Sequence, residues 1–164
     1  MGTNVDMFLK IDGIKGESLD SAHPGEIEIL SFNWGVQNIG SSASGQGLGS
    51  GKASFEDFNI TKVADASSPV LMENCATGAH IASAILTIRK AGGKKLEYYK
   101  IKFNDLLISS FTNAGSGDDS VPVENVSLNY TKIFIQYTQQ QADGSGGPVS
   151  KGGYDLKTQQ TVSG

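Results

Sequence analysis

The stretch HIASAILTIRKAGGKKLEYYKIKFNDLLISSF, residues 80–111, contains two long runs of strand-forming side chains on either side of a short AGG segment. Isoleucine, threonine, tyrosine and phenylalanine recur through these runs, and β-branched and aromatic residues favour strands. Glycine in the AGG segment permits the positive φ angles of a tight turn. The stretch therefore predicts an antiparallel hairpin, and it favours a mainly β fold.

Further strands are predicted on both sides of this hairpin. Apolar residues alternate with polar ones in residues 5–11, 26–38, 52–62 and 123–138, as in strands that bury one face. In residues 26–38 the alternation slips by one position after Ile29, and in residues 123–138 it slips after Tyr130. Such a slip is typical of a bulge, or of a bend where a strand passes from one sheet to another.

The first slip divides residues 30–37 into two faces with different chemistry. We predict that the apolar face belongs to the core, and it carries Leu30, Phe32, Trp34 and Val36. The opposite face is small or polar and uncharged, and it carries Ser31, Asn33, Gly35 and Gln37.

One helix is predicted, within residues 65–80. Ser68 suits its N-cap, Pro69 its first position and Gly78 its end. A helix this short depends on docking against a sheet. Its docking face is predicted to carry Leu71, Met72 and Cys75.

The length of 164 residues suits one domain, which we assign to residues 1–164. Residues 139–153, rich in glycine and glutamine, are predicted to form a loop, and residues 154–158 a last short strand. Seven to nine strands with one helix predict a compact β-barrel or sandwich.

Charge and composition disfavour several classes of partner. The net charge is −4 and the pI is about 5.1, whereas nucleic acid and anionic membranes need a basic surface. No apolar run approaches the roughly 20 residues of a membrane span, so no membrane insertion is expected. The N-terminal segment MGTNVDMFLKIDG does not have the pattern of a secretory signal peptide. The single cysteine, Cys75, suits folding in a reducing compartment.

The residues give little support to nucleotide or metal binding. The segment ending in Gly51 and Lys52 suggests a phosphate-binding loop, but Gln46 and Ala53 stand where that motif needs a glycine and a hydroxyl. His23 and His80 have no second ligand at zinc spacing. No metal site and no cofactor are expected.

Catalysis is also disfavoured. Asp118, Asp119 and Asp143 lie in glycine-rich turns without calcium-loop spacing. The acidic pairs of residues 26/28 and 56/57 fit solvated strand positions better than a glycosidase pair. We therefore expect a structural or binding protein rather than an enzyme.

Five segments carry a resemblance to a known family. They are DMFLKIDGIKGES (6–18), EIEILSFNWGV (26–36), SPVLMENCATGAHI (68–81), AILTIRKAGGKKLEYYKIKFNDLLISS (84–110) and VENVSLNYTKI (123–133). Together they resemble the Hcp family, the tube proteins of the bacterial type VI secretion system. The resemblance runs from Asp6 to about Lys157.

The resemblance implies a two-sheet β-barrel with one short flanking α-helix, assembling head-to-tail as a hexameric ring. Stacked rings would form the inner tube, which a contractile sheath drives out of the cell with effector proteins in its channel. Implied partners are further copies of the chain, a spike protein, sheath and baseplate components, and effectors. The protein would be made in the cytoplasm and exported by the type VI machine without a signal peptide.

Two sets of residues are candidates for these contacts. Ser31, Asn33 and Gln37 are candidates for the channel wall, because a channel for varied cargo should be polar and interact weakly; exposure to bulk solvent is the alternative. The long glycine-rich loop of residues 39–51 is a candidate for contact with a neighbouring subunit or ring, and simple solvation is the alternative. Its candidate contact residues are Ser42, Ser44, Gln46, Leu48 and Ser50.

Two other functions remain open from sequence. A tail-tube protein of a phage-like contractile particle would share the architecture. A monomeric β-barrel binding module, for example for carbohydrate, would need exposed aromatic platforms, and Trp34 alternates with polar residues in a way that predicts burial.

Overall fold

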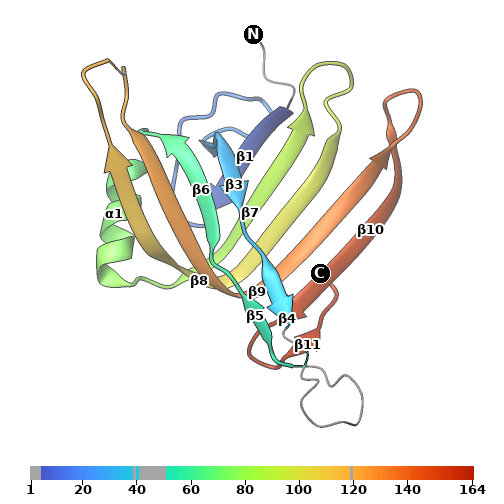
Figure 1. Ribbon diagram of the computed structural model, residues 1–164. Coiled ribbons are helices and arrows are strands. Elements are labelled where there is room, and N and C mark those ends of the chain that lie inside the picture. The colour runs from blue at the N-terminus through green and yellow to red at the C-terminus, as the bar shows by residue number, and fades with distance from the viewer. Residues whose placement is uncertain (1–4, 39, 41–50, 119) are drawn as a thin grey trace.

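The computed structural model describes residues 5–38, 40, 51–118 and 120–164, which form a mainly β protein with one α-helix among those residues (Figure 1). Two long strands, β8 and β9, extend across the whole molecule. The elements in chain order are β1 (Val5–Ile11), β2 (Ile27–Glu28), β3 (Ser31–Asn33), β4 (Val36–Asn38), β5 (Ala53–Phe55), β6 (Phe58–Val63), α1 (Ser68–Thr77), β7 (Ile81–Lys90), β8 (Glu97–Ala114), β9 (Val123–Gln140), β10 (Gly146–Asp155) and β11 (Gln160–Thr161).

The hairpin predicted from residues 80–111 forms the centre of the main sheet. Strand β7 pairs with β8, and the main ladder has the order β11-β10-β9-β8-β7-β1-β2. All of its pairings are antiparallel. Strands β4 and β5 form a separate two-stranded sheet. Among the described residues, no helix is both long and apolar enough to cross a membrane.

Strand β9 changes partner along its length, and this change creates two walls. Its first part pairs with β6, from Val63↔Val123 to Phe58↔Leu128. Its second part pairs with β10, beginning at Lys132↔Asp155. The opposite edge of β9 stays paired with β8 throughout, so β8 and β9 pass from one wall to the other (Figure 1). The phase slip after Tyr130 lies at this change of partner.

The first phase slip marks a similar change of partner. The backbone N–H of Ile29 donates to the carbonyl oxygen of Met7 in β1, at 3.2 Å. The next N–H, of Leu30, donates to the carbonyl oxygen of Thr61 in β6, at 2.7 Å. The chain thus passes from the edge of one wall to the other within one residue, which is the second of the two explanations that the slip left open.

The two sheets of the implied β-barrel do not close into one continuous ladder in the described part of the chain. The main ladder begins at β11 and ends at β2, and β3 and β6 join it only through β9. The ladder stays open because β2 and β6 share no ladder hydrogen bonds. At this edge the backbone of Ile29 and Leu30 connects the two walls.

The core lies between the two walls, and part of the predicted core face is wrong. Leu30 and Val36 are 56% and 48% exposed, whereas Phe32 and Trp34 are partly buried against the core. Leu30 is exposed because it lies where the chain leaves β1 for β6, beyond the cover of either wall. The best-buried core side chains include Leu9, Ile27, Phe58, Ile60, Leu71, Leu86, Ile101, Phe103, Val126 and Leu128.

Helix α1 ends where predicted, but it begins one residue earlier than predicted. Ser67 is its N-cap, and Ser68 is its first residue. The Ser68 hydroxyl instead accepts from the Asp65 N–H at 3.0 Å and donates to Glu124 Oε1 at 2.7 Å. Gly78 ends the helix with a φ of 64°, which favours glycine. Leu71 is buried, whereas Met72 is exposed, contrary to prediction.

The predicted loop of residues 139–153 is also wrong in part. Residues 146–153 belong to β10, which pairs with β9. Glycine and proline give this segment little intrinsic strand preference, so its conformation comes from the long partner strand.

Candidate functional site: an uncharged face of the sheet

The exposed side of β3, β6, β9 and β8 carries two rows of small polar side chains. Direct cross-strand partners lie on the same side of a sheet, so the pairings define each row. We call this surface the polar face. Its first row is Ser31, Thr61, Asn125 and Thr112, and its second is Asn33, Asn59, Ser127 and Ser110.

Hydrogen bonds connect the side chains of the second row across all four strands. Asn59 Nδ2 donates to Asn33 Oδ1 at 3.0 Å, and Ser127 Oγ donates to Asn59 Oδ1. Ser110 Oγ donates to Ser127 Oγ at 3.1 Å. In the first row, Thr61 Oγ1 donates to Asn125 Oδ1 at 2.9 Å. These bonds satisfy many polar groups within the row and orient the side chains.

The polar face rests directly on the core. Phe58 and Ile60 alternate with the polar residues of β6, and Val126 and Leu128 alternate with those of β9; all four are 0–1% exposed. Because successive side chains of a strand point to opposite sides of the sheet, the neighbours of each polar residue along the strand pack into the core. The face is therefore a fixed surface rather than a mobile loop.

An acidic group borders this face. Asp57 accepts from Ser109 Oγ at 2.7 Å and from Asn129 Nδ2 at 2.9 Å. Beneath it, the Tyr130 hydroxyl donates to the carbonyl oxygen of Glu56 at 2.8 Å. Burial, together with the nearby charges of Asp57 and Glu56, raises the pKa of Tyr130 to about 12, so the hydroxyl keeps its proton.

The structure brings together two of the three predicted channel residues. Ser31 and Asn33 both lie exposed on the polar face. Gln37 is exposed on β4, in the separate two-stranded sheet, where it pairs with Ser54. The predicted contact residues of the glycine-rich loop, Ser42, Ser44, Gln46, Leu48 and Ser50, lie outside the described residues.

Sequence reasoning missed most of the polar face. The missed residues are Asn59, Thr61, Ser110, Thr112, Asn125 and Ser127. In β6 and β9 they alternate with apolar residues, so each strand carried a signal, but the register that aligns the strands did not follow from sequence.

A hollow opens at the edge where the two walls are not joined. We call it the open edge; its apolar lining includes Val5, Met7, Ile29, Leu30 and Val63. The hollow has a volume of about 360 Å³. Leu30 and Val63 are 56% and 37% exposed, so apolar surface close to the core is accessible there.

The remaining polar clusters connect structural elements. His23 lies between Glu26 and Glu97, with its ring nitrogens 2.8 and 2.6 Å from carboxylate oxygens. Arg89 pairs with Asp20 at 2.7 Å and with Asp6 at 2.9 Å. In the described part of the chain, no group of three or more His, Cys, Asp or Glu side chains is arranged to hold a metal ion.

Comparison with known proteins gives consistent similarities. The family described as "Type VI secretion system effector, Hcp" matches residues 8–137. Protein hcp1 of Pseudomonas aeruginosa is 45% identical over 151 residues, which cover 90% of this chain and 93% of that protein. A solved type six secretion system protein superposes with a TM-score of 0.91 at 31% identity, covering 96% of this chain and 99% of its own. Hcp1 from Salmonella typhimurium gives a TM-score of 0.81 at 36% identity, covering 98% and 100%.

Proposed function

Because the chain belongs to the Hcp family of type VI secretion system proteins, we propose that six copies close into a ring and that stacked rings form the inner tube of the machine. The tube is expelled with effector proteins in its channel, and the protein leaves the cytoplasm by this route. Its role is structural, without catalysis or a cofactor. Its partners are other copies, effectors, and spike, sheath and baseplate components.

The polar face is the observation that carries the channel assignment. Hydroxyl and amide groups, fixed by mutual hydrogen bonds, give a hydrated wall without a strong charge. Cargo of either sign can pass such a wall because its two rows carry no charged side chain that would repel or retain it. We therefore assign Ser31 and Asn33 to the channel wall and place Gln37 nearer one end of it.

Ring closure needs two different patches on each copy, because a head-to-tail contact joins unlike surfaces. The open edge supplies one of them. Leu30 and Val63 expose apolar area beside the core, and exposed apolar patches commonly mark contact surfaces. A neighbouring subunit seated there would complete the cover that the unjoined walls leave open.

Stacking of rings is assigned to the glycine-rich loop of residues 39–51. Its small side chains give it little capacity to pack on its own domain, and long loops are often functional. Ser42, Ser44, Gln46, Leu48 and Ser50 are its proposed contact residues. Family membership favours this tube over a phage-like particle or a monomeric binding module.

Electron microscopy of purified protein tests the proposal. Wild-type protein should give annular particles and short tubes. Asn33→Gln should assemble and change cargo retention little, because it keeps an uncharged amide. Asn33→Arg should still assemble but alter cargo retention, because it adds charge to the wall. Deletion of residues 42–49 should leave rings that no longer stack.

Three results would count against these assignments. Strictly monomeric wild-type protein at high concentration would contradict the tube. Loss of rings in Asn33→Arg would place Asn33 at a subunit boundary instead of the channel. Normal stacking after the deletion would remove the loop from the ring-to-ring contact.

A further inference from the structure

Residues 15–26 form a loop that covers part of β1 and β7 on the side away from the core. We call this loop the strap. It is folded back on itself, since the Ser18 N–H donates to the carbonyl oxygen of Glu26 at 3.0 Å. Beneath it, Phe8 of β1 and Thr87 of β7 are direct cross-strand partners, and both are buried. The strap is therefore an ordered cover over one patch of the sheet.

Two anchors hold the strap on the sheet. In its middle, the Asp20 carboxylate accepts hydrogen bonds from both terminal nitrogens of Arg89, at 3.0 and 2.7 Å. Closer to its end, the His23 ring lies parallel to the Phe8 ring, with 4.4 Å between the ring centroids. His23 Nε2 also lies 2.6 Å from Glu97 Oε1, at the start of β8. The strap is thus attached to β7 at one point and to β1 and β8 at another.

The carboxylates of both anchors are charged near neutral pH. Hydrogen bonds from Arg89 hold the pKa of the Asp20 carboxyl well below its usual range. Burial raises the pKa of the Glu97 carboxyl, but hydrogen bonds from His23 and Lys100 outweigh burial, so this pKa lies below its ordinary value. An imidazole is the side chain that ordinarily changes its charge near neutral pH. Only the second anchor contains one.

The geometry of His23 requires a proton on each ring nitrogen. Nδ1 lies 2.8 Å from Glu26 Oε2, and Nε2 lies 2.6 Å from Glu97 Oε1. A carboxylate only accepts hydrogen bonds, whereas a neutral imidazole has one donor nitrogen and one acceptor nitrogen. Loss of a ring proton would therefore set a nitrogen lone pair against a carboxylate. Because His23 is buried, water cannot relieve this contact while the strap is closed.

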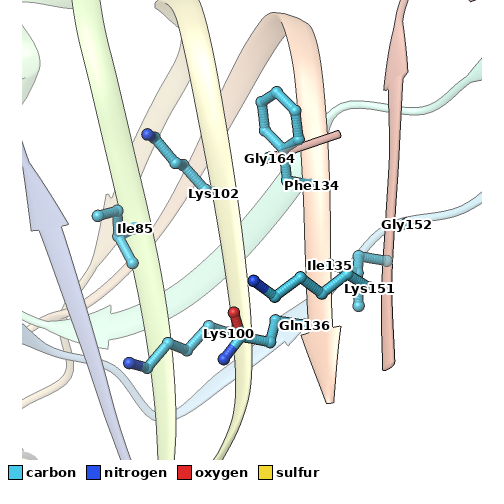
Figure 2. A pocket seen from close by; sticks show the side chains of 9 residues that line it. All are labelled: Ile85, Lys100, Lys102, Phe134, Ile135, Gln136, Lys151, Gly152 and Gly164. Atoms are coloured by element: carbon cyan, nitrogen blue, oxygen red, sulfur yellow. The ribbon is translucent and has the colours of Figure 1, made fainter. Parts of the chain in front are cut away.

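Further charged groups near His23 come from the strap and from the strands beneath it. Figure 2 shows Lys100 of β8 on the same side of the sheet as Ile85 of β7, and Lys100 Nζ lies 3.2 Å from Glu97. The charged neighbours are Asp20 and Glu26 on the strap, Asp6 on β1, Glu28 on β2, Arg89 on β7, and Glu97 and Lys100 on β8. Carboxylates predominate in this set, which favours a cationic imidazole among them.

We propose that His23 is a pH-sensitive latch, and that loss of its second ring proton between about pH 6 and pH 9 releases the end of the strap. The Asp20–Arg89 anchor stays charged over this range and keeps the strap tethered. The closed strap holds one proton more than the open strap. Opening is therefore favoured as the pH rises, and closing is favoured as the pH falls. This inference goes beyond the proposed function, since it concerns each copy of the chain separately.

Release of the latch would change the surface in two places. Phe8 would lose the ring that covers it, so an aromatic side chain would become accessible on the sheet. Glu97, which begins β8 directly after the β7–β8 turn, would lose its contact with His23, 74 positions earlier in the chain. The protonation state of one side chain would thus determine whether the strap and the start of β8 are held together.

Amide hydrogen exchange at pH 6 and pH 9, measured by mass spectrometry, tests the latch. Protection factors remove the direct effect of pH on exchange chemistry. Those of residues 16–26 should fall at least about tenfold at pH 9, because each pH unit beyond the titration of one linked proton shifts an equilibrium by up to tenfold. His23→Gln, which cannot gain a proton there, should change less than about twofold between the two pH values. The matched control His80→Gln, at the exposed histidine, should respond like wild type.

Glu97→Gln tests the facing acceptors directly. Its amide can donate to an unprotonated Nε2 of His23 while Nδ1 still donates to Glu26. The strap should therefore stay protected at pH 9, within about twofold of its protection at pH 6. Opening of the Glu97→Gln strap at pH 9 to the same extent as in wild type would overturn the inference.

A measurement on wild type alone avoids any dependence on how the variants fold. Exchange of the imidazole C2 hydrogen, also measured by mass spectrometry, follows the protonation of each of the two histidines separately. Deprotonation of His23 should have the same midpoint as the loss of protection in residues 16–26. Unchanged protection from pH 6 to pH 9 would overturn the latch, as would a midpoint that follows His80 instead or an equal pH response in His23→Gln.

Discussion

At Lys62 the fold buries a charge at the base of the helix. The side chain is fully buried, and its Nζ lies 2.6 Å from Glu124 Oε1 and 3.0 Å from Asp65 Oδ1. Ser68, the first residue of α1, donates to the same Glu124 oxygen. The buried carboxylate therefore connects β6, β9 and α1, and its loss would leave the buried Lys62 charge only partly compensated, by Asp65.

We predict that Glu124→Leu lowers the free energy of unfolding by about 3–5 kcal/mol, because the Lys62 charge stays buried and loses the nearer of its two carboxylate partners, keeping Asp65 and the Ser68 hydroxyl. The double variant Lys62→Met/Glu124→Leu should recover much of this loss, because it removes both charges. Urea unfolding at a fixed protein concentration, followed by Trp34 fluorescence, measures both. Asn125→Ala, at the exposed neighbouring position, is the control. A double variant as unstable as Glu124→Leu would contradict the explanation.

Asp20 gives the stability a dependence on pH. Its hydrogen bonds with Arg89 and with the Ala22 N–H lower the pKa of the Asp20 carboxyl well below its usual range. A carboxyl with a depressed pKa in the folded state stabilises the fold above the unfolded pKa of about 4 and loses that contribution as the pH falls toward the folded value. Arg89 stays protonated throughout.

Asp20→Asn should therefore narrow the difference in thermal unfolding temperature between pH 7 and pH 3. Its loss relative to wild type should be larger at pH 7 than at pH 3, because at pH 3 the unfolded wild-type chain binds the proton that the folded Asp20 carboxylate still excludes. Scanning calorimetry at the two pH values measures this effect, with Asp12→Asn, at an exposed position, as the control. An equal narrowing in Asp12→Asn would show that Arg89 has no special part in it.

At the scale of elements, β10 depends on a glycine where another chain segment crosses it. A Cβ at Gly153 would lie 2.6 Å from Phe134 Cδ1 and 2.7 Å from the carbonyl oxygen of Val162. At the neighbouring Gly152, a Cβ would meet nothing within 4 Å. The two adjacent glycines thus differ in what a methyl group would displace.

Gly153→Ala should lower the free energy of unfolding by about 1–3 kcal/mol, because Val162 and Phe134 must move to admit the methyl group. Gly152→Ala should stay within about 0.5 kcal/mol of wild type. Chemical unfolding of the two variants side by side measures the difference. Similar stability of both would mean that the end of the chain does not need the close approach to β10.

The same strand shows where sequence reasoning fails. Glycine and proline in residues 146–153 predicted a loop, but pairing with β9 outweighs the low strand preference of these residues. The phase slips after Ile29 and Tyr130 could be recognised in the sequence because side chains of a strand alternate with a period of two. They located both changes of partner, yet gave no means to tell that Leu30, at the change itself, would be exposed.

The candidate site was predictable within a strand but not between strands. Alternation placed Ser31 and Asn33 on an uncharged face. It could not align them with Asn59 and Ser127, because that alignment depends on the register of β3, β6 and β9. Lys10, Lys102 and Lys151 are a stronger case, since they share no local sequence pattern and come to lie on one side of the sheet only through five paired strands.

At the scale of the whole molecule, the unjoined walls have a consequence for assembly. The ladder ends at β2, and the walls meet at the open edge only through the backbone of Ile29 and Leu30. A monomer therefore keeps apolar surface in water beside its own core. Cover by a second copy would bury that surface, with a gain of roughly 25 cal/mol for each Å² of apolar area removed from water.

Leu30→Glu should therefore prevent ring formation while the monomer still folds. The side chain is 56% exposed in the isolated chain, so a charged group can stay hydrated there, but a neighbour seated on the open edge would bury it without a partner. Leu30→Met, which keeps apolar area and similar volume, should form rings like the wild type. Light scattering measures the assembly state, and far-ultraviolet circular dichroism measures the fold. Rings formed equally well by Leu30→Glu would place the subunit contact elsewhere, whereas an unfolded Leu30→Glu would show that Leu30 supports the monomer itself.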